Sequence, residues 1–339
     1  MRPRTEVLLN SLVGEYIETA CPVASETLAR KAESRMSSAT VRNEMAELEE
    51  EGYIVRPHVS SGAVPSDKGY RFYVERLGEG VRPSVWASEQ LRQRFWKTGP
   101  ALDSWVRAAA QMLATMVDTV AIVTFPGGGR SRLKRIELVY LREFLALLIV
   151  VLQGARLLQQ MVPLSEPASH DELTSVANKL SFLFAGLNRS QMEEREAEFT
   201  PLENQVRENA LSMMQEAEEE AFDPYVDGLR RTLGQPEFSE GERVSALVSV
   251  LEDKALMRKV LAGAATRYQV QVLIGRENRE EALWPFSLVL CPYGFPDGAR
   301  GILGVLGPTR LPYPTALGGV RFLSGVMTEI MDSVQGSTG

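Results

Sequence analysis

Residues 37–51 carry the side chains of this chain that are best suited to reading DNA. The run SSATVRNEMAELEEE repeats apolar side chains at Val41, Met45 and Leu48, which predicts the buried face of a helix. At about 100° per residue, the opposite face carries small and polar groups that allow close approach to base edges. The residues that we expect to read bases are Ala39, Thr40, Arg42 and Asn43.

The chemistry of these groups matches the edges of base pairs. Asparagine can form two hydrogen bonds with adenine, arginine can reach guanine, and methyl groups can contact thymine. Ser37 and Ser38 lie at the helix N-terminus, where free amides favour phosphate. The acidic end, ELEEE, should point away from the DNA backbone. An ordinary amphipathic helix with a solvated face gives the same pattern, so this helix alone leaves both interpretations open.

The segment after this helix predicts a hairpin, or wing, with polar and cationic groups. Gly52 should end the helix, and Tyr53–Pro57 and Lys68–Val74 are candidate strand or post-strand segments on either side of the loop HVSSGAVPSD. A loop beside a recognition helix usually meets phosphates or the minor groove. The residues that we expect to contact DNA there are Arg56, His58, Ser60, Ser61, Lys68 and Arg71.

Two further helices should support the recognition helix. Apolar residues recur at helical spacing over Thr5–Ala20, Pro22 ends that run, and Ser25 can cap the helix SETLARKAE. Two short helices joined by a turn form a helix-turn-helix, and the hairpin adds a wing. We therefore predict a winged helix-turn-helix over residues 1–82, followed by a linker over 83–100.

Composition limits the other classes of function. The net charge is −7, and residues 1–82 hold 11 Lys/Arg against 13 Asp/Glu, which argues against nonspecific coating of nucleic acid. Two distant cysteines and no apolar run of membrane-spanning length favour a cytoplasmic protein without membrane contact, and a DNA-binding function would make it nucleoid-associated. The histidines are His58 and His170, and no nucleophile motif, metal-ligand spacing or cofactor motif occurs. We expect no enzyme, no metal and no cofactor, and we interpret GGGRS at 127–131 as a hairpin turn.

The remainder of the chain predicts a mixed α/β domain with an insertion. A helix from residue 101 precedes strand-like runs up to residue 164, and strands resume at Tyr268–Gly275, Phe286–Cys291 and Gly301–Leu306. Between them, residues 190–227 hold 12 Asp/Glu and 2 Arg, which indicates a helical insertion over 168–238. The apolar residues of its first helix are our candidate dimer surface: Leu180, Phe182, Leu183, Phe184 and Leu187.

Three long motifs resemble a known family. They are YIETACPVASETLARK, SSATVRNEMAELEEEGYIVRPHVSSGAVPSDKGYRFYV and GILGVLGPTRLPY, and they resemble the HrcA family of heat-inducible transcription repressors. The resemblance implies a winged helix, a GAF-like domain at 101–167 and 239–339, and an inserted dimerisation domain. It also implies a homodimer on a CIRCE-type inverted-repeat operator of chaperone operons, with the repressor kept active by the chaperonin GroEL and lost on heat stress.

One departure and one alternative follow from this comparison. Ala63 stands where the family usually has arginine, so we expect weaker wing contacts and tighter binding when arginine is restored. The alternative function is a metabolite-responsive regulator with a ligand in the GAF-like domain, which convergent polar groups in a pocket would favour. We expect that domain to be a structural spacer instead.

Overall fold

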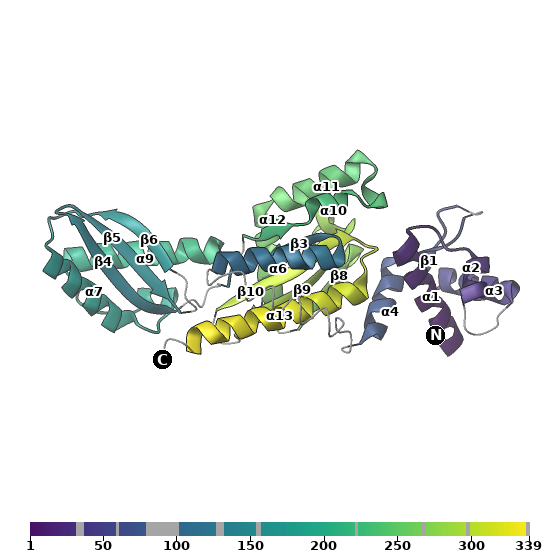
Figure 1. The fold of residues 1–339 in the computed structure, drawn as a ribbon, viewed down its shortest axis with the longest axis horizontal. Helices are drawn as coiled ribbons and strands as arrows, with labels where there is room; N and C mark the ends of the chain where they lie inside the picture. Colours follow the sequence, from purple (N-terminus) through teal and green to yellow (C-terminus); the bar gives the residue numbers. More distant parts are fainter. Residues whose placement is uncertain are drawn as a thin grey trace.

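The computed structural model describes residues 1–31, 37–58, 61–78, 102–126, 132–153, 157–220, 223–265, 269–295 and 299–336. The chain is a mixed α/β protein with several sheets, as expected from the sequence. Three parts lie in a row: helices α1–α4 at one end, a five-stranded sheet in the middle, and a three-stranded sheet with its own helices at the other end (Figure 1). The expected linker at 83–100, the turn at 127–131 and Ser60 lie outside the described residues.

The N-terminal part consists of four helices and a two-stranded antiparallel sheet. Its elements are α1 (Pro3–Thr19), α2 (Ser25–Lys31), α3 (Ser38–Glu50), β1 (Ile54–Val55), β2 (Val64–Pro65) and α4 (Asp67–Leu77). Of the two possibilities for Lys68–Val74, a strand or a segment that follows the strand, the strand is wrong, because these residues form α4 after β2. The Ser66 hydroxyl caps that helix by accepting from the Gly69 amide at 3.2 Å, and Tyr70 and Val74 are buried one turn apart.

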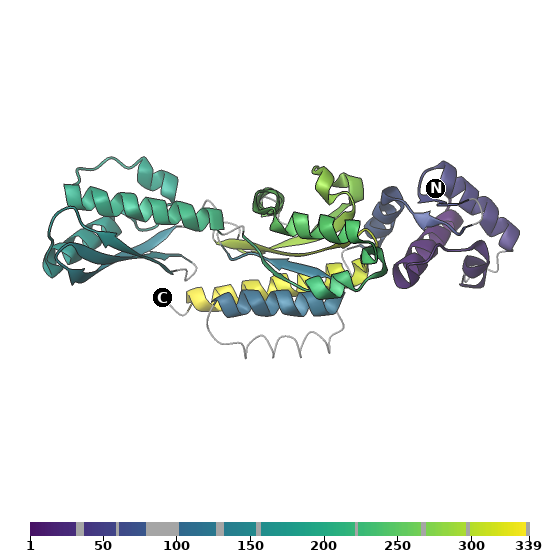
Figure 2. The ribbon, with the colours of Figure 1, turned by 90° about the horizontal axis from the view of Figure 1, so that it is seen from above.

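The central part is a five-stranded antiparallel sheet in the order β7-β3-β10-β9-β8. Its strands are β3 (Val120–Val123), β7 (Tyr225–Asp227), β8 (Gln271–Ile274), β9 (Phe286–Gly294) and β10 (Arg300–Pro308). Helices α6 (Leu102–Val117) and α13 (Tyr313–Gly336) cover one face, and α11 (Gly241–Glu252) and α12 (Lys254–Ala265) lie on the other (Figure 2). The helix α10 (Leu229–Leu233) and three short 3-10 helices, η1 (Pro236–Phe238), η2 (Gly275–Glu277) and η3 (Glu281–Leu283), complete this part.

Alternation along the central strands separates two hydrophobic cores. Ala121 and Val123 of β3 join the core under α6 and α13, whereas Val120 and Ile122 join the core under α11 and α12. Because successive strand side chains point to opposite faces, both faces of this sheet are buried. The first core also includes buried side chains of α1, α3 and α4, so it continues into the N-terminal part.

The third part is an antiparallel sheet of β4 (Leu133–Arg142), β5 (Leu145–Leu152) and β6 (Leu157–Pro163). Its helices are α7 (His170–Phe184), α8 (Arg189–Glu193) and α9 (Pro201–Glu220), and α9 lies along one face of the sheet (Figure 2). The expected boundaries of the insertion do not fit this arrangement. The strands assigned to the GAF-like domain share a core with α7 and α9, while β7 pairs with β3 in the central sheet.

The five residues proposed as the dimer surface on α7 do not share one environment. Leu180 and Phe184 are fully buried in the core between α7 and the three-stranded sheet, and Leu183 and Leu187 pack partly against that core. Leu180 and Phe184 were therefore wrongly assigned, because a buried side chain cannot contact a second molecule. Phe182 points outward and is 87% exposed.

Candidate nucleic-acid interface

Both ends of α3 are set by local hydrogen bonds. The Ser37 hydroxyl accepts from the Thr40 amide at 3.2 Å and so caps the N-terminus. At the other end, Gly52 has a φ of +77°, its amide donates to Glu49 O, and the Tyr53 amide donates to Leu48 O. This pair of bonds is a Schellman motif, for which glycine is favoured because of its positive φ. The predicted glycine stop is confirmed.

The faces of α3 follow the predicted periodicity. Val41, Met45 and Leu48 are buried, whereas Ala39, Arg42 and Asn43 are exposed. Ser37 and Ser38 are also exposed, and Thr40 is half-buried, with its hydroxyl 3.0 Å from that of Ser37. The structure thus brings all the expected base-reading residues and both serines to one open end of the helix.

Glu44 ties the inner side of α3 to α1, which sequence reasoning missed. This carboxylate is 3% exposed, accepts from the Thr5 hydroxyl at 2.5 Å, and pairs with Arg4. The Thr5 hydrogen bond, together with the arginines, lowers the pKa of Glu44 below its ordinary 4.5 despite burial. Glu44 follows Val41 by three residues, so its place on the apolar face was the available signal.

Arg42 is held in place by α2. Its Nη2 donates to Glu26 Oε1 at 2.5 Å and its Nε donates to Ser25 Oγ at 3.3 Å. The hydrogen bond from Arg42 also lowers the pKa of Glu26. Because both side chains of this ion pair are more than half exposed, the guanidinium remains accessible to a base or phosphate from outside.

The loop between β1 and β2 is anchored to the turn between α1 and α2. Ala63 and Val23 exchange two backbone hydrogen bonds of 2.9 and 2.8 Å, and a Cβ on Gly62 would lie 2.6 Å from the backbone of Pro22. At the loop tip the Ser61 hydroxyl accepts from the His58 amide at 3.0 Å, and His58 is exposed. Arg56, at the base, lies 3.4 Å from Glu49.

Ala63 is completely buried, which contradicts the expectation that an arginine here would add a phosphate contact. The position points into the interior beneath the loop, so a long cation would have to displace packed neighbours before it reached solvent. Ala63→Arg alone is therefore expected to cost stability and not to tighten DNA binding.

Lys68 and Arg71 lie on α4 and have partners inside the protein. Lys68 Nζ donates to Glu51 O at 2.8 Å and lies 4.1 Å from the centroid of the Tyr53 ring. Arg71 binds Glu277 of the central part through both ends of its guanidinium. Arg71 was expected to contact DNA phosphate, but its guanidinium is already paired with Glu277. This pairing arises because residue 71 lies on a helix, α4, and not on a strand of the wing.

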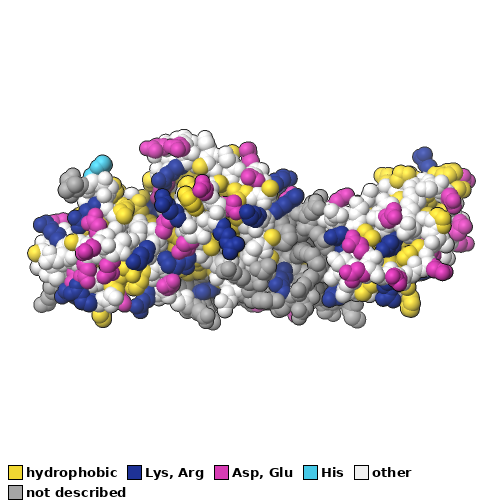
Figure 3. Space-filling view, turned by 180° about the vertical axis from the view of Figure 1, so that it is seen from behind, with side chains coloured by type: hydrophobic (Ala, Val, Ile, Leu, Met, Phe, Trp, Pro, Cys, Tyr) yellow, Lys and Arg dark blue, Asp and Glu magenta, His cyan; other side chains and the backbone are white. Residues whose placement is uncertain are grey.

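Charge on this part of the molecule is balanced. Lys and Arg side chains alternate with Asp and Glu over the face of the α1–α4 part seen from behind (Figure 3). DNA binding here must therefore depend on the local placement of a few groups at the end of α3 and in the loop, as the net charge indicated.

A pocket in the central part is the other concave feature of interest. Its volume is about 450 Å³, and it lies between α12, β8 and the η2–η3 segment. Its walls combine apolar Leu273, Leu283 and Leu290 with polar Lys259 and Arg279. Within the described part of the chain, no group of three His, Cys, Asp or Glu side chains could hold a metal ion, and no helix is long and apolar enough to cross a membrane.

A capped helix with a small exposed face beside a short anchored loop is typical of a DNA-binding regulator. Residues 103–317 match the family model described as HrcA protein C terminal domain. A relative from Dehalococcoides mccartyi (strain ATCC BAA-2266 / KCTC 15142 / 195) is 37% identical over 99% of this chain and 97% of its own length. A relative from Herpetosiphon aurantiacus is 34% identical over 99% and 97%, and both are named heat-inducible transcription repressor HrcA.

The chain belongs to the HrcA family of heat-inducible transcription repressors, which is a family of regulators and not of enzymes. A solved structure described as a hypothetical protein at 2.2 Å resolution is similar with a TM-score of 0.65. It is 20% identical and the match covers 98% of this chain and 99% of that one, so this likeness concerns the fold.

The Glu44 cluster predicts a pH-dependent stability. Since folding lowers the pKa of Glu44, its contribution is complete above 4.5 and is lost as pH falls through the folded-state pKa. We expect Glu44→Gln to cost about 1.5–3 kcal/mol of unfolding free energy near neutral pH, because a buried charged acceptor is lost. The difference in unfolding free energy between Glu44→Gln and wild type, measured by urea unfolding, should be smaller at about pH 3.5 than near neutral pH.

Glu47→Gln is the matched control for this measurement. Glu47 lies on α3, as Glu44 does, and pairs with Arg2 at the protein surface, where both side chains are more than a third exposed. Loss of this ion pair should therefore cost less than about 1 kcal/mol of unfolding free energy. Equal effects of the two substitutions at both pH values would contradict the role given to Glu44.

Proposed function

We propose that this chain represses heat-shock chaperone operons by binding, as a homodimer, to a CIRCE-type inverted-repeat operator. The observation that carries this proposal is the exposed end of α3, where Ala39, Arg42 and Asn43 face outward together. We further propose that α1–α4 is a winged helix-turn-helix, that the central sheet is a GAF-like domain, and that the unit of β4–β6 with α7–α9 is the inserted dimerisation domain.

In this proposal the first two turns of α3 enter the major groove. Asn43 can bond adenine, Arg42 can leave Glu26 for guanine or phosphate, and the methyl groups of Ala39 and Thr40 can meet thymine. The N-cap Ser37 and the neighbouring Ser38 lie where free amides favour a phosphate. Arg56, His58 and Ser61 would meet the backbone from the loop beside the helix.

Asn43→Ala tests this assignment. Loss of two hydrogen bonds to one base should cost about 1–3 kcal/mol of binding free energy and relax preference at one operator position. Fluorescence anisotropy with the inverted repeat and a scrambled duplex measures both effects. Asn204→Ala, on the distant α9, is the control and should leave affinity unchanged; equal binding of both duplexes by wild type would contradict the proposed function.

The second copy of the chain has a candidate surface on the three-stranded sheet. Val139, Leu147 and Met161 lie opposite one another across β4, β5 and β6, so they share one face. Ala146, Leu148 and Val150 alternate with half-buried positions of β5 and belong to the core shared with the helices instead. Met161 is 65% exposed and Leu157, at another rung of this face, is 66% exposed.

An apolar sheet face of this kind favours contact with another protein surface, because it is costly to leave in water. We therefore move the proposed dimer interface from α7 to the outer face of β4–β6. This location keeps the contact between subunits away from α3, so that two α3 helices remain free for two half-sites related by a two-fold axis.

Met161→Glu and Phe182→Glu distinguish the two locations. A charge at Met161 should raise the dimer dissociation constant about tenfold or more, since it must be desolvated in the interface. Phe182→Glu, on α7 and not on the sheet, should have little effect. Sedimentation equilibrium measures both, and the reverse ranking would return the interface to α7.

Loss of repression on heating requires no catalytic step. A repressor with an ordinary, small free energy of unfolding loses its folded population steeply as temperature rises. A chaperonin that refolds it would shift the balance back, and we propose GroEL as that partner on the strength of the family resemblance. Competition by other unfolded proteins would then release the operon.

The pocket beside α12 favours a second candidate, a metabolite-responsive regulator. Its volume of about 450 Å³ is within the range of ligand sites, and two cations and three leucines could hold a small carboxylic acid. However, Lys259 already pairs with Glu280 at 2.6 Å and its side chain is 70% exposed, so we retain the structural role for this domain.

Benzoate is a suitable probe for this alternative, since it combines a carboxylate with an apolar ring. We expect millimolar benzoate to leave both the melting temperature and the operator affinity unchanged. A melting temperature raised by several degrees, with a change in affinity that Lys259→Ala abolishes, would instead support the metabolite-responsive regulator.

A further inference from the structure

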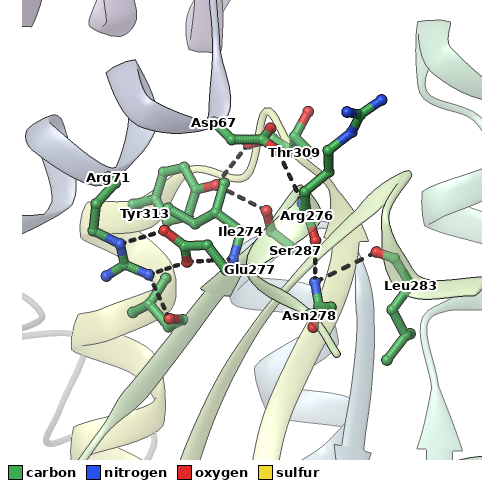
Figure 4. Close-up of polar contacts among 12 residues, drawn as sticks. Asp67, Arg71, Ile274, Arg276, Glu277, Asn278, Leu283, Ser287, Thr309 and Tyr313 are labelled. Atoms are coloured by element: carbon green, nitrogen blue, oxygen red, sulfur yellow. Dashed lines mark hydrogen bonds and ion pairs between the residues drawn. The ribbon is translucent and has the colours of Figure 1, made fainter. Parts of the chain in front are cut away.

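Arg71 of α4 connects the N-terminal part to the central sheet. Its Nε donates to Glu277 Oε1 at 2.7 Å, its Nη2 donates to Glu277 Oε2, and the same Nη2 donates to Val272 O at 2.6 Å. Glu277 is itself oriented, because Oε2 accepts from the Ile274 amide at 2.9 Å. Figure 4 shows this fork-to-carboxylate pair between α4 and the end of β8. Two parallel charge-assisted bonds fix relative orientation as well as distance.

Asp67, one turn before Arg71, makes a second connection. Its Oδ2 accepts from the Arg276 amide at 2.9 Å, and both groups lie beside the Arg71 pair in Figure 4. The neighbouring Gly275 has a φ of +50°, and a Cβ there would collide with the Asp67 carboxylate. The tight approach of α4 to the η2 turn thus depends on glycine at this position.

The same junction has an aromatic and a third polar contact. Tyr70 of α4 and Tyr313 at the start of α13 are both buried, with ring centroids 5.8 Å apart. Tyr313 in turn donates to Thr309 O at 2.7 Å. Arg310 donates to Ile17 O near the end of α1 at 2.7 Å and also pairs with Glu237.

These contacts explain two of the sequence motifs. The DKGYR run, expected to serve the wing, supplies Asp67, Tyr70 and Arg71, and the GPTRLPY run supplies Thr309, Arg310 and Tyr313. Polar pairs, a close glycine and a shared hydrophobic core act together at this junction. A junction with that many directional contacts holds one orientation, whereas a merely tethered domain would sample many.

We infer that Asp67, Arg71 and Glu277 are positioning residues for DNA recognition, which set the spacing of operator half-sites that the dimer accepts. The inference rests on the proposed function, in which two α3 helices meet two half-sites. If the subunits join elsewhere, the distance and angle between the two α3 helices depend on how rigidly each α1–α4 part is held on its central sheet. Half-site spacing is then a geometric consequence of this junction.

The test varies the spacing between half-sites in single base-pair steps and also uses a duplex with one isolated half-site. The proteins compared are full-length wild type, Glu277→Gln, Arg71→Gln and Glu193→Gln. The last breaks the Arg189–Glu193 pair on α8, away from the junction, and is the matched control. Fluorescence anisotropy gives each dissociation constant, and melting temperatures identify variants that fold.

Wild type and Glu193→Gln should prefer one spacing by roughly tenfold over neighbouring spacings, since rigid linkage rewards only matching geometry. Glu277→Gln should reduce this preference to about threefold or less while leaving the isolated half-site affinity unchanged. Arg71→Gln should do the same, and it decides the matter should Glu277→Gln fail to fold.

The outcomes separate the two proposals. Absence of any preference of wild type for an isolated half-site over scrambled DNA would contradict the proposed function itself. A wild type that recognises the half-site and discriminates spacing, with folded Glu277→Gln or Arg71→Gln variants that discriminate equally well, would overturn the inference about the junction. The inference would also be overturned if a variant that loses its spacing preference lost its affinity for the isolated half-site by the same factor.

Discussion

The anchoring of α3 by its inner face is the constraint on which the rest of the structure depends. Val41, Met45 and Leu48 bury their side chains in the core, and Glu44 adds a charged contact to α1 from the same side. Rotation of the helix by one residue would bring polar groups into the interior at a cost of several kcal/mol. The orientation of α3 is therefore fixed, and its opposite face is left to Ala39, Arg42 and Asn43.

The other parts of the molecule hold the exposed face of α3 in position. The anchored loop limits movement beside the helix, because Ala63 bonds to Val23 and Gly62 lies against the backbone of Pro22. The junction of α4 with η2 and α13 transmits the position of the central sheet to the helix. The β4–β6 sheet lies at the far end of the molecule from α3, so a second copy bound there, as proposed above, would leave α3 uncovered (Figure 1).

Sequence reasoning was most reliable where a single element determines its own pattern. The burial of α3 and its end at Gly52 followed from periodicity and from the conformational preference of glycine. The segment 68–74 was mistaken for a strand because it contains Tyr70, Phe72 and Tyr73, and aromatic residues favour strands. The Ser66 cap with Asp67 after it was the signal for a helix.

Contacts between segments that are far apart in the chain could not be predicted from local sequence patterns. The apolar runs from 133 to 163 predicted strands, but which elements pack together is a tertiary property, so the patterns did not show that β4–β6 share a core with α7–α9. Likewise, Leu180 and Phe184 were grouped with Phe182 by composition, although four-residue spacing puts the first two on one face. The Arg71–Glu277 contact joins residues more than two hundred positions apart, and a basic residue near a wing gave no indication of it.

Footprinting of the full-length protein on the promoter of its own chaperone operon tests the central claim most directly. A dimer that places two α3 helices on the operator should give two protected half-sites related by a two-fold axis, with protection in the major groove that disappears when Asn43 is replaced by alanine. Uniform protection, no protection, or a footprint that is indifferent to the exposed face of α3 would contradict it.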